Sequence, residues 1–135
     1  MKVVVDTMLW VSFAVNPEGY RHRLIKTARR QRVRLFVSEY ILNELERTLV
    51  EGLGCTKRFG ALAQRAVLRT AQLVELPEFI PRHVPGDPND DPILQTALTA
   101  KAHYLVTADI EILKLVKIHS VAILSPSDFA AQLGL

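Results

Sequence analysis

The chain has 135 residues, of which 49% are hydrophobic and 23% charged, and its formal net charge is +3. This length fits one domain over residues 1–135, the composition argues against disorder, and the single cysteine, Cys55, excludes an internal disulfide. No uncharged apolar run approaches the roughly 18 residues of a membrane span, and Asp6 interrupts the apolar N-terminal stretch that a signal peptide would need, so we expect a cytoplasmic protein.

The first predicted element is a short strand over Val3–Val5, whose three β-branched residues favour burial on both faces. Asp6 follows at its carboxyl end, which in an open parallel sheet faces the crevice where ligands bind. Alternatively, Asp6 merely caps the next helix, a position that Asp favours. That helix is expected over Thr7–Val15, because these residues are mostly apolar and the turn 16–19, Asn-Pro-Glu-Gly, follows them.

The next predicted helix, Tyr20–Arg32, is strongly basic and belongs to the basic part of the chain. Residues 1–76 carry 13 Lys and Arg against seven Asp and Glu, whereas residues 77–135 carry four against seven. The helix and the residues after it include these cations: Arg21, Arg23, Lys26, Arg29, Arg30, Arg32 and Arg34. The usual explanation for such a run is a solvated helix face. The functional alternative is a patch that follows a nucleic-acid backbone, which is held mainly by Arg and Lys.

A second strand is predicted at Leu35–Val37, with Ser38 as the N-cap of a helix that extends to Glu51. Leucine and isoleucine residues form one apolar stripe on this helix. At about 100° per residue, Glu44 and Glu46 lie on opposite borders of the stripe. Periodicity alone therefore does not decide which of these two carboxylates faces the ligand crevice.

A long helix is predicted over Lys57–Leu76 from its apolar spacing, and Pro77 would end it. Residues 77–92 hold five of the seven prolines and form a loop, in which Phe79–Val84 is a candidate short strand. The loop ends in an acidic turn with three carboxylates: Asp87, Asp90 and Asp91. Capping the following helix needs only one of these acids, so their mutual repulsion suggests a divalent cation.

In the last part of the chain an acid again follows a predicted strand. A buried strand is expected at Tyr104–Thr107 and is followed by Asp109, just as the first strand is followed by Asp6. A short helix over Ile110–Val116, a strand over Val121–Leu124 and a final helix capped by Ser125 come next. Strands that alternate with helices predict an α/β fold with a parallel sheet of four to five strands, covered on both faces.

The carboxylates expected at the carboxyl edge of this sheet are Asp6, Asp90 or Asp91, Asp109, and a Glu from the second strand's helix. They cannot all be ionised at neutral pH without compensation, and hard oxygen ligands suit Mg²⁺ or Mn²⁺. Such a site could activate water in phosphoryl displacement. The four histidines lack zinc-site spacing, and nucleotide-binding glycine loops and the nucleophile elbow of serine hydrolases are absent from the sequence.

At this point the sequence resembles a known family in four stretches that occur in order over nearly the whole chain. They are Val3-Val4-Val5-Asp6-Thr7, Val37-Ser38-Glu39-Tyr40-Ile41-Leu42-Asn43-Glu44-Leu45, Asp87-Pro88-Asn89-Asp90-Asp91-Pro92-Ile93-Leu94 and Tyr104-Leu105-Val106-Thr107-Ala108-Asp109. Each motif alone is weak, but the ordered set is fairly specific. It looks like a PIN-domain protein of the kind identified as the toxin of bacterial toxin–antitoxin pairs.

The resemblance implies a three-layer α/β/α sandwich and a Mg²⁺- or Mn²⁺-dependent ribonuclease that cuts single-stranded RNA. Its acidic quartet, carried over residue by residue, would be Asp6, Glu44, Asp90 and Asp109. Glu44 matches the family's Glu-Leu pair, Asp90 matches an acid three residues before an apolar position, and Asp91 would be an accessory ligand. Thr7 and Thr107 would position the substrate, Thr107 matching a hydroxyl that the family places beside the scissile phosphate or a metal-bound water.

The hypothesis that follows assigns Asp6, Asp90 and Asp109 to one metal ion and Glu44 to a second ion or the attacking water. The cations that would guide the RNA backbone are Arg21, Arg23, Lys26, Arg29 and Arg30. A small antitoxin that occludes the site is the partner that the resemblance implies. Homodimerisation through the long helices is expected from the resemblance and from the apolar face of residues 59–74.

One position departs from the family pattern, because Met8 stands where an Asn usually follows Asp-Thr. Met cannot orient the first Asp through a strong hydrogen bond, so reduced activity or altered substrate preference is expected.

A non-catalytic PIN-like module that binds RNA or a partner protein is one rival interpretation, although it would not need the four acids. A receiver domain of two-component signalling is another. It would need an acid beside Asp6 and a Lys before Pro126, where the chain has Ser125.

Overall fold

A six-stranded, mostly parallel sheet forms the centre of the computed structural model, which describes residues 1–83 and 87–135. The strand order across the sheet is β3-β2-β1-β4-β6-β5, and only the β5–β6 pair is antiparallel. The strands are β1 (Lys2–Val5), β2 (Arg34–Ser38), β3 (Gln72–Val74), β4 (Tyr104–Val106), β5 (Lys117–Ile118) and β6 (Val121–Leu124). The predicted α/β fold with a mostly parallel sheet is therefore confirmed, but the sheet has six strands instead of the predicted four to five, and its edge strand β5 is antiparallel.

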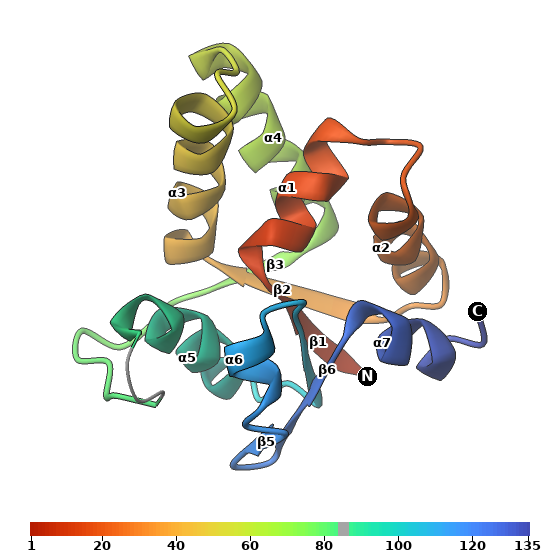
Figure 1. Cartoon of the computed structure of the whole chain (residues 1–135), viewed down its shortest axis with the longest axis vertical. Coiled ribbons are helices and arrows are strands. Elements are labelled where there is room, and N and C mark those ends of the chain that lie inside the picture. The colour runs from red at the N-terminus through yellow and green to blue at the C-terminus, as the bar shows by residue number, and fades with distance from the viewer. Residues whose placement is uncertain (84–86) are drawn as a thin grey trace.

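Helices cover both faces of this sheet. The α-helices are α1 (Thr7–Val15), α2 (Tyr20–Arg30), α3 (Glu39–Arg47), α4 (Lys57–Thr70), α5 (Asp91–Thr99), α6 (Ile110–Leu113) and α7 (Pro126–Gln132). A π-helical turn, Thr48–Gly52, follows α3, and a short 3₁₀ turn, Pro88–Asp90, precedes α5. Helices α1 to α4 lie on one side of the sheet and α5 on the other (Figure 1). Within the described ranges, the helices are too short or too polar to cross a bilayer.

Strand β1 lies at the middle of the sheet, paired with β2 on one side and β4 on the other. Val3, Val4 and Val5 are each at most 1% exposed, as expected for a strand covered on both faces. The backbone N–H of Asp6 still donates to the carbonyl oxygen of Val106, at 2.9 Å. The ladder thus continues to Asp6, which fixes this residue at the carboxyl edge of the sheet.

Several predicted boundaries match the structure closely because their signals are local. The helix after β1 spans Thr7–Val15, as predicted. Ser38 caps α3, its hydroxyl accepting from the backbone N–H of Ile41 at 3.4 Å, and Ser125 caps α7 in the same way. The predicted helix to Glu51 is α-helical only as far as Arg47 and continues as the π-helical turn.

The prediction was wrong around the end of the long helix. Helix α4 ends at Thr70, and residues predicted as its last turns form β3, a parallel edge strand beside β2. Ala71 already has an extended backbone, with φ −130° and ψ 151°, so the helix does not reach Val74. The apolar residues from Ala71 to Val74 therefore do not continue the apolar face of α4. The candidate strand Phe79–Val84 is also wrong for residues 79–83, which are not in a strand, while Val84 lies outside the described residues.

Candidate active site

A pocket of about 460 Å³ opens at the carboxyl edge of the sheet. We call it the acidic pocket, and it is lined by Asp6, Thr7, Met8, Arg21, Glu44, Thr48, Asp90, Ile93, Ala108 and Asp109. The four acids come from the end of β1, from α3, from the turn before α5 and from the end of β4. The chain thus brings together in space the four carboxylates that the sequence comparison singled out.

Asp6 is buried, with 7% of its surface exposed. It occupies the N-cap position of α1, but its carboxylate makes no capping hydrogen bond. Instead, its Oδ2 accepts from the hydroxyl of Thr107 at 2.6 Å. Burial raises the pKa of Asp6 above its ordinary value, and the nearby Glu44 carboxylate adds to this rise, while the bond from Thr107 opposes it. Asp6 is therefore held in place as a site carboxylate rather than as a helix cap.

Glu44 faces the acidic pocket, whereas Glu46 does not. The Oε1 atom of Glu44 accepts from the hydroxyl of Thr7 at 2.5 Å, and its Oε2 lies 3.3 Å from the hydroxyl of Tyr40. Glu46 lies on the α4 side, because a Cβ built on Gly60 would stand 3.0 Å from its Cγ. The choice that helical periodicity left open is thus resolved by the packing of α3 between α1 and α4.

Among the four acids of the acidic pocket, Asp90 has the fewest groups nearby that could stabilise a negative charge on its carboxylate. It is only 8% exposed, and no hydrogen-bond donor or cation of the described residues contacts its carboxylate. Burial, together with the neighbouring carboxylates of Asp109 and Asp87, raises the pKa of Asp90 to about 6. The carboxylate oxygens of Asp90 still reach solvent, since they are not among the fully buried polar atoms without a partner. Its raised pKa makes this acid easier to protonate than an ordinary aspartate and favours a bound cation when it is ionised.

Asp109 is exposed and begins α6, where its Oδ1 accepts from the backbone N–H of Glu111 at 2.8 Å. Its own N–H donates to the hydroxyl oxygen of Thr107 at 3.0 Å. Thr107 is fully buried and therefore joins two of the acids, since it donates to Asp6 and accepts from Asp109. The hydroxyl thus fixes the carboxylate of Asp6 relative to the backbone of Asp109.

Asp91 has a different position from the other acids. Its Oδ1 accepts from the backbone N–H of His83 at 2.6 Å, and its Oδ2 pairs with the guanidinium of Arg82 at 3.0 Å. Asp87 caps the 3₁₀ turn, accepting from the N–H of Asn89 at 2.9 Å. Of the three acids in this turn, one therefore caps a helix, one anchors the preceding loop, and Asp90 alone lines the acidic pocket.

The donor set of the acidic pocket fits a divalent metal ion by its chemistry. Its four carboxylates are hard oxygen donors, and burial raises the pKa values of Asp6 and Asp90, so a bound cation would stabilise their ionised forms. As they stand, no three His, Cys, Asp or Glu side chains in residues 1–83 and 87–135 form a group close enough to enclose an ion. The fit therefore rests on the kind, burial and charge of the acids.

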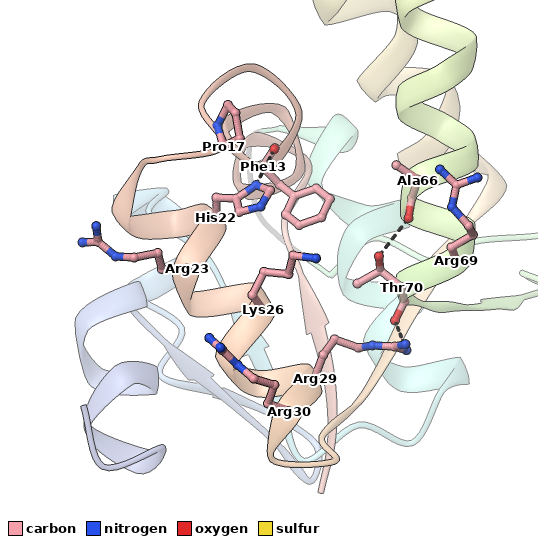
Figure 2. A pocket seen from close by; sticks show the side chains of 10 residues that line it. All are labelled: Phe13, Pro17, His22, Arg23, Lys26, Arg29, Arg30, Ala66, Arg69 and Thr70. Carbon is pink, nitrogen blue, oxygen red and sulfur yellow. Dashed lines mark hydrogen bonds between the residues drawn. The ribbon is translucent and has the colours of Figure 1, made fainter.

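The basic residues predicted to guide RNA are divided between two places. Arg21 lines the acidic pocket. The other four line a second pocket of about 820 Å³ between α2 and α4, which we call the basic pocket. Its lining residues are Phe13, Pro17, His22, Arg23, Lys26, Arg29, Arg30, Ala66, Arg69 and Thr70, all drawn in Figure 2. The helix thus contributes one cation to the acidic pocket and four to a separate surface.

Two residues near these pockets, Tyr40 and Arg69, were not predicted from the sequence. The hydroxyl of Tyr40 lies within hydrogen-bond distance of Glu44 and of the carbonyl oxygen of Asn89, and burial raises the pKa of Tyr40 to about 12, so it stays a donor. Its spacing of four residues from Glu44 was a usable signal. Arg69 gave no such signal, because its place in the basic pocket depends on how α4 packs beside α2.

Comparison with known proteins supports the fold. Residues 2–111 match a family model described as PIN domain. A similar solved structure is a chain in the crystal structure of VapBC2 from Rickettsia felis bound to a DNA fragment from their promoter. The match covers 93% of this chain and 98% of that chain, with a TM-score of 0.67 and 15% sequence identity, so the likeness is one of fold. No curated protein sequence matches this chain.

Proposed function

Because the chain belongs to the PIN domain family, we propose that it is a Mg²⁺- or Mn²⁺-dependent endoribonuclease that cleaves single-stranded RNA. The observation that carries this proposal is the acidic pocket, where four carboxylates from four parts of the chain line one space. Asp90 in particular is 8% exposed, no donor or cation of the described residues contacts its carboxylate, and its pKa is raised to about 6. A purely structural site would have no reason to accumulate this uncompensated charge.

The residues of the acidic pocket take the following proposed roles. Asp6, Asp90 and Asp109 hold one metal ion, and Glu44 positions a second ion or the attacking water. When bound, the ion supplies Lewis-acid activation of water and neutralises charge that develops on the phosphate. Thr107 keeps Asp6 and Asp109 in register through its two hydrogen bonds. Thr7 donates its hydroxyl to Glu44, and we assign to Thr7 and Thr107 the positioning of the substrate.

The cellular role that we propose is the toxin of a toxin–antitoxin pair. The fold likeness to a chain of VapBC2 supports it, as does the family of the chain. The partner would be a small antitoxin that occludes the acidic pocket.

A homodimer is proposed as well, because Phe59 and Leu62 on α4 are 36% and 47% exposed and would be covered by a second copy.

A second candidate is a PIN-like module that binds RNA or a partner protein with little or no cleavage. Met8 favours it, because this side chain lines the acidic pocket and is 49% exposed where an orienting amide would be expected. The same acids would then bind a metal ion without efficient turnover. Measured cleavage separates the two candidates.

The test is cleavage of a labelled single-stranded RNA by the purified protein with Mg²⁺, with Mn²⁺ and with a chelator. We expect metal-dependent cutting that the chelator abolishes. Asp6→Asn should reduce the rate by at least about 100-fold, the order seen when one group that stabilises a transition state is removed. Asp128→Asn, an exposed acid in the first turn of α7, is the matched control and should cut normally.

Two results would contradict the proposal. Cleavage that persists in the chelator, or that Asp6→Asn leaves unchanged, would show that the acidic pocket does not catalyse it. Folded protein that binds Mn²⁺ by calorimetry, but cuts none of a pool of single-stranded RNAs of random sequence, would favour the binding module.

A further inference from the structure

The basic pocket carries a positive charge that the described residues do not neutralise. Five of its lining side chains are cationic, and its lining includes no acid. The two ion pairs found among the described residues, Arg82 with Asp91 and Lys114 with Glu111, lie elsewhere. Any anion that enters this pocket therefore meets cations with no competing carboxylate.

The cations of the basic pocket come from two helices that are far apart in the sequence (Figure 2). Lys26 extends from α2 into the space between the helices, and Arg69 stands on α4 at the opposite wall, whereas Arg23 points away from α4. Arg29 is already engaged, since its Nη1 donates to the carbonyl oxygen of Thr70 at 2.9 Å. Lys26 and Arg69 are both exposed, and within residues 1–83 and 87–135 their side chains make no ion pair, so their charges are available.

The basic pocket is connected to the acidic pocket along the surface. A smaller pocket of about 270 Å³, which we call the linking pocket, lies at the start of α2. Arg21 lines both the acidic and the linking pocket, and His22 lines both the linking and the basic pocket. The three pockets therefore adjoin one another around the N-terminal turn of α2, and together we call them the path.

Aromatic rings lie along this path between the cations. Tyr20 lines the linking pocket and is 45% exposed. The ring of His22 stacks on Phe13, with centroids 4.4 Å apart and planes 9° from parallel, and its Nδ1 lies 2.8 Å from the carbonyl oxygen of Phe13. Cations that follow a phosphate backbone, with aromatic rings that can stack on bases, are the combination that binds single-stranded nucleic acid.

We propose that this path binds the part of a single-stranded RNA that extends beyond the acidic pocket, with Lys26 and Arg69 contacting its phosphates in the basic pocket. The inference rests on the proposed ribonuclease function, and it adds a contact from α4 that the basic helix alone does not provide. An acidic peptide could also use the cations, but cations next to exposed rings are the combination typical of single-stranded nucleic-acid binding. The continuous path with both features therefore favours RNA.

The test measures RNA binding by fluorescence anisotropy in the Asp6→Asn protein, which need not cut. Labelled RNAs of about 4 and about 16 nucleotides, near the limits of a single-strand site, distinguish the acidic pocket alone from the whole path. Lys26→Glu with Arg69→Glu is compared with Arg58→Glu with Arg65→Glu, an equal charge change at exposed positions of α4 outside the three pockets.

We expect the Lys26–Arg69 double variant to weaken binding of the long RNA at least about tenfold and to leave the short RNA within about twofold. The slope of log affinity against log salt should fall by about 1.4, the value for two lost phosphate contacts on a single strand. The Arg58–Arg65 variant should weaken the long RNA less than about threefold.

Three results would overturn the inference. Equal weakening by both double variants would mean that only the overall charge matters, and an unchanged long RNA would mean that RNA does not follow the path. Weakened binding of a polyglutamate peptide with unchanged binding of RNA would assign the pocket to an acidic peptide. Because binding is measured without cleavage, failure of the wild-type protein to cut RNA would count against the ribonuclease and not against this path.

Discussion

The acidic and basic pockets hold their charges in opposite ways. In the acidic pocket, Asp6 and Asp90 are at most 8% exposed, and burial, with a smaller contribution from neighbouring carboxylates, raises their pKa values. In the basic pocket, Lys26 and Arg69 are exposed to water, which hydrates each charge separately. The carboxylates of Asp6 and Asp90 are therefore harder to ionise than ordinary ones, whereas the cations of the basic pocket are individually hydrated.

The two pockets also differ in how firmly their groups are positioned. Short hydrogen bonds from Thr107 and Thr7 fix the carboxylates of Asp6 and Glu44. Lys26 and Arg69 are long side chains on helix surfaces and can adapt to a ligand. Catalysis needs the first arrangement, because small displacements of reacting groups cost much rate, and backbone tracking tolerates the second.

Removing one threonine hydroxyl beside each pocket should give the largest effect, because only the acidic pocket depends on firmly positioned side chains. In Thr107→Val, Asp6 and Asp109 both lose the group that holds them, so the rate of metal-dependent RNA cleavage should fall about 10- to 100-fold, as for other groups that orient metal ligands. Thr70→Val removes a hydroxyl that only bonds the carbonyl oxygen of Ala66, at 2.8 Å, and should leave the rate within about twofold. Initial rates under saturating RNA provide the measurement.

A purely structural role for Thr107 would give a different pattern. Thr107→Ser keeps the hydroxyl and should restore most of the rate, even though it removes a buried methyl group and lowers the free energy of unfolding. If Thr107→Ser is as slow as Thr107→Val, the hydroxyl does not position the carboxylates, and the loss comes from packing.

The next effect in size concerns pH and stability without metal. The pKa of Asp90 is about 6 in the folded protein against an ordinary value of 3.8, so between these pH values the folded state keeps a proton that the unfolded state has lost. The free energy of unfolding contributed by this group therefore falls as pH rises from about 4 to about 6 and stays low above that. Asp90→Asn should be more stable than the wild type by about 1 to 2 kcal/mol at pH 7, allowing for solvent screening, and equal to it near pH 4.

Urea unfolding in the presence of a chelator, followed at several pH values, measures this difference. Lys26→Gln is the control from the basic pocket, because it removes one exposed charge and should leave the pH dependence of the wild type unchanged. If the unfolding free energies of Asp90→Asn and wild type differ by the same amount at all pH values, the pKa of Asp90 is not raised in the folded protein.

The sequence predicted those parts of the fold that depend on local signals. The valines of β1, the cap at Ser38 and the turn after Val15 act within a few residues, and the helix Thr7–Val15 was predicted with both of its ends. Strand β3 was missed because an edge strand of three residues, with Leu73 52% exposed, carries little pattern of its own. Its apolar residues continued the helical spacing of α4 by chance.

The candidate site was predictable only in part for a related reason. Asp6 and Asp109 follow strands, so parallel pairing brings them to one edge whatever the helices do. The orientation of Glu44 and the different place of Asp91 depend on contacts with Thr7 and Arg82, which are distant in sequence or lie in an irregular loop. The resemblance to a family chose Glu44, but the contacts explain the choice.

The smallest expected effect tests the boundary between the two pockets. Met8 lines the acidic pocket, and Ser12, one helical turn later on α1, lines the linking pocket. Met8→Asn adds one polar group that can orient a carboxylate or the substrate, and a hydrogen bond of about 0.5 to 1 kcal/mol corresponds to a two- to fivefold faster cleavage. Because the change lies in the acidic pocket, short and long RNAs should gain equally, whereas Ser12→Asn should affect only the long RNA. A gain limited to long RNA in Met8→Asn would mean that the RNA path begins at Met8 and that the two pockets are not separate in function.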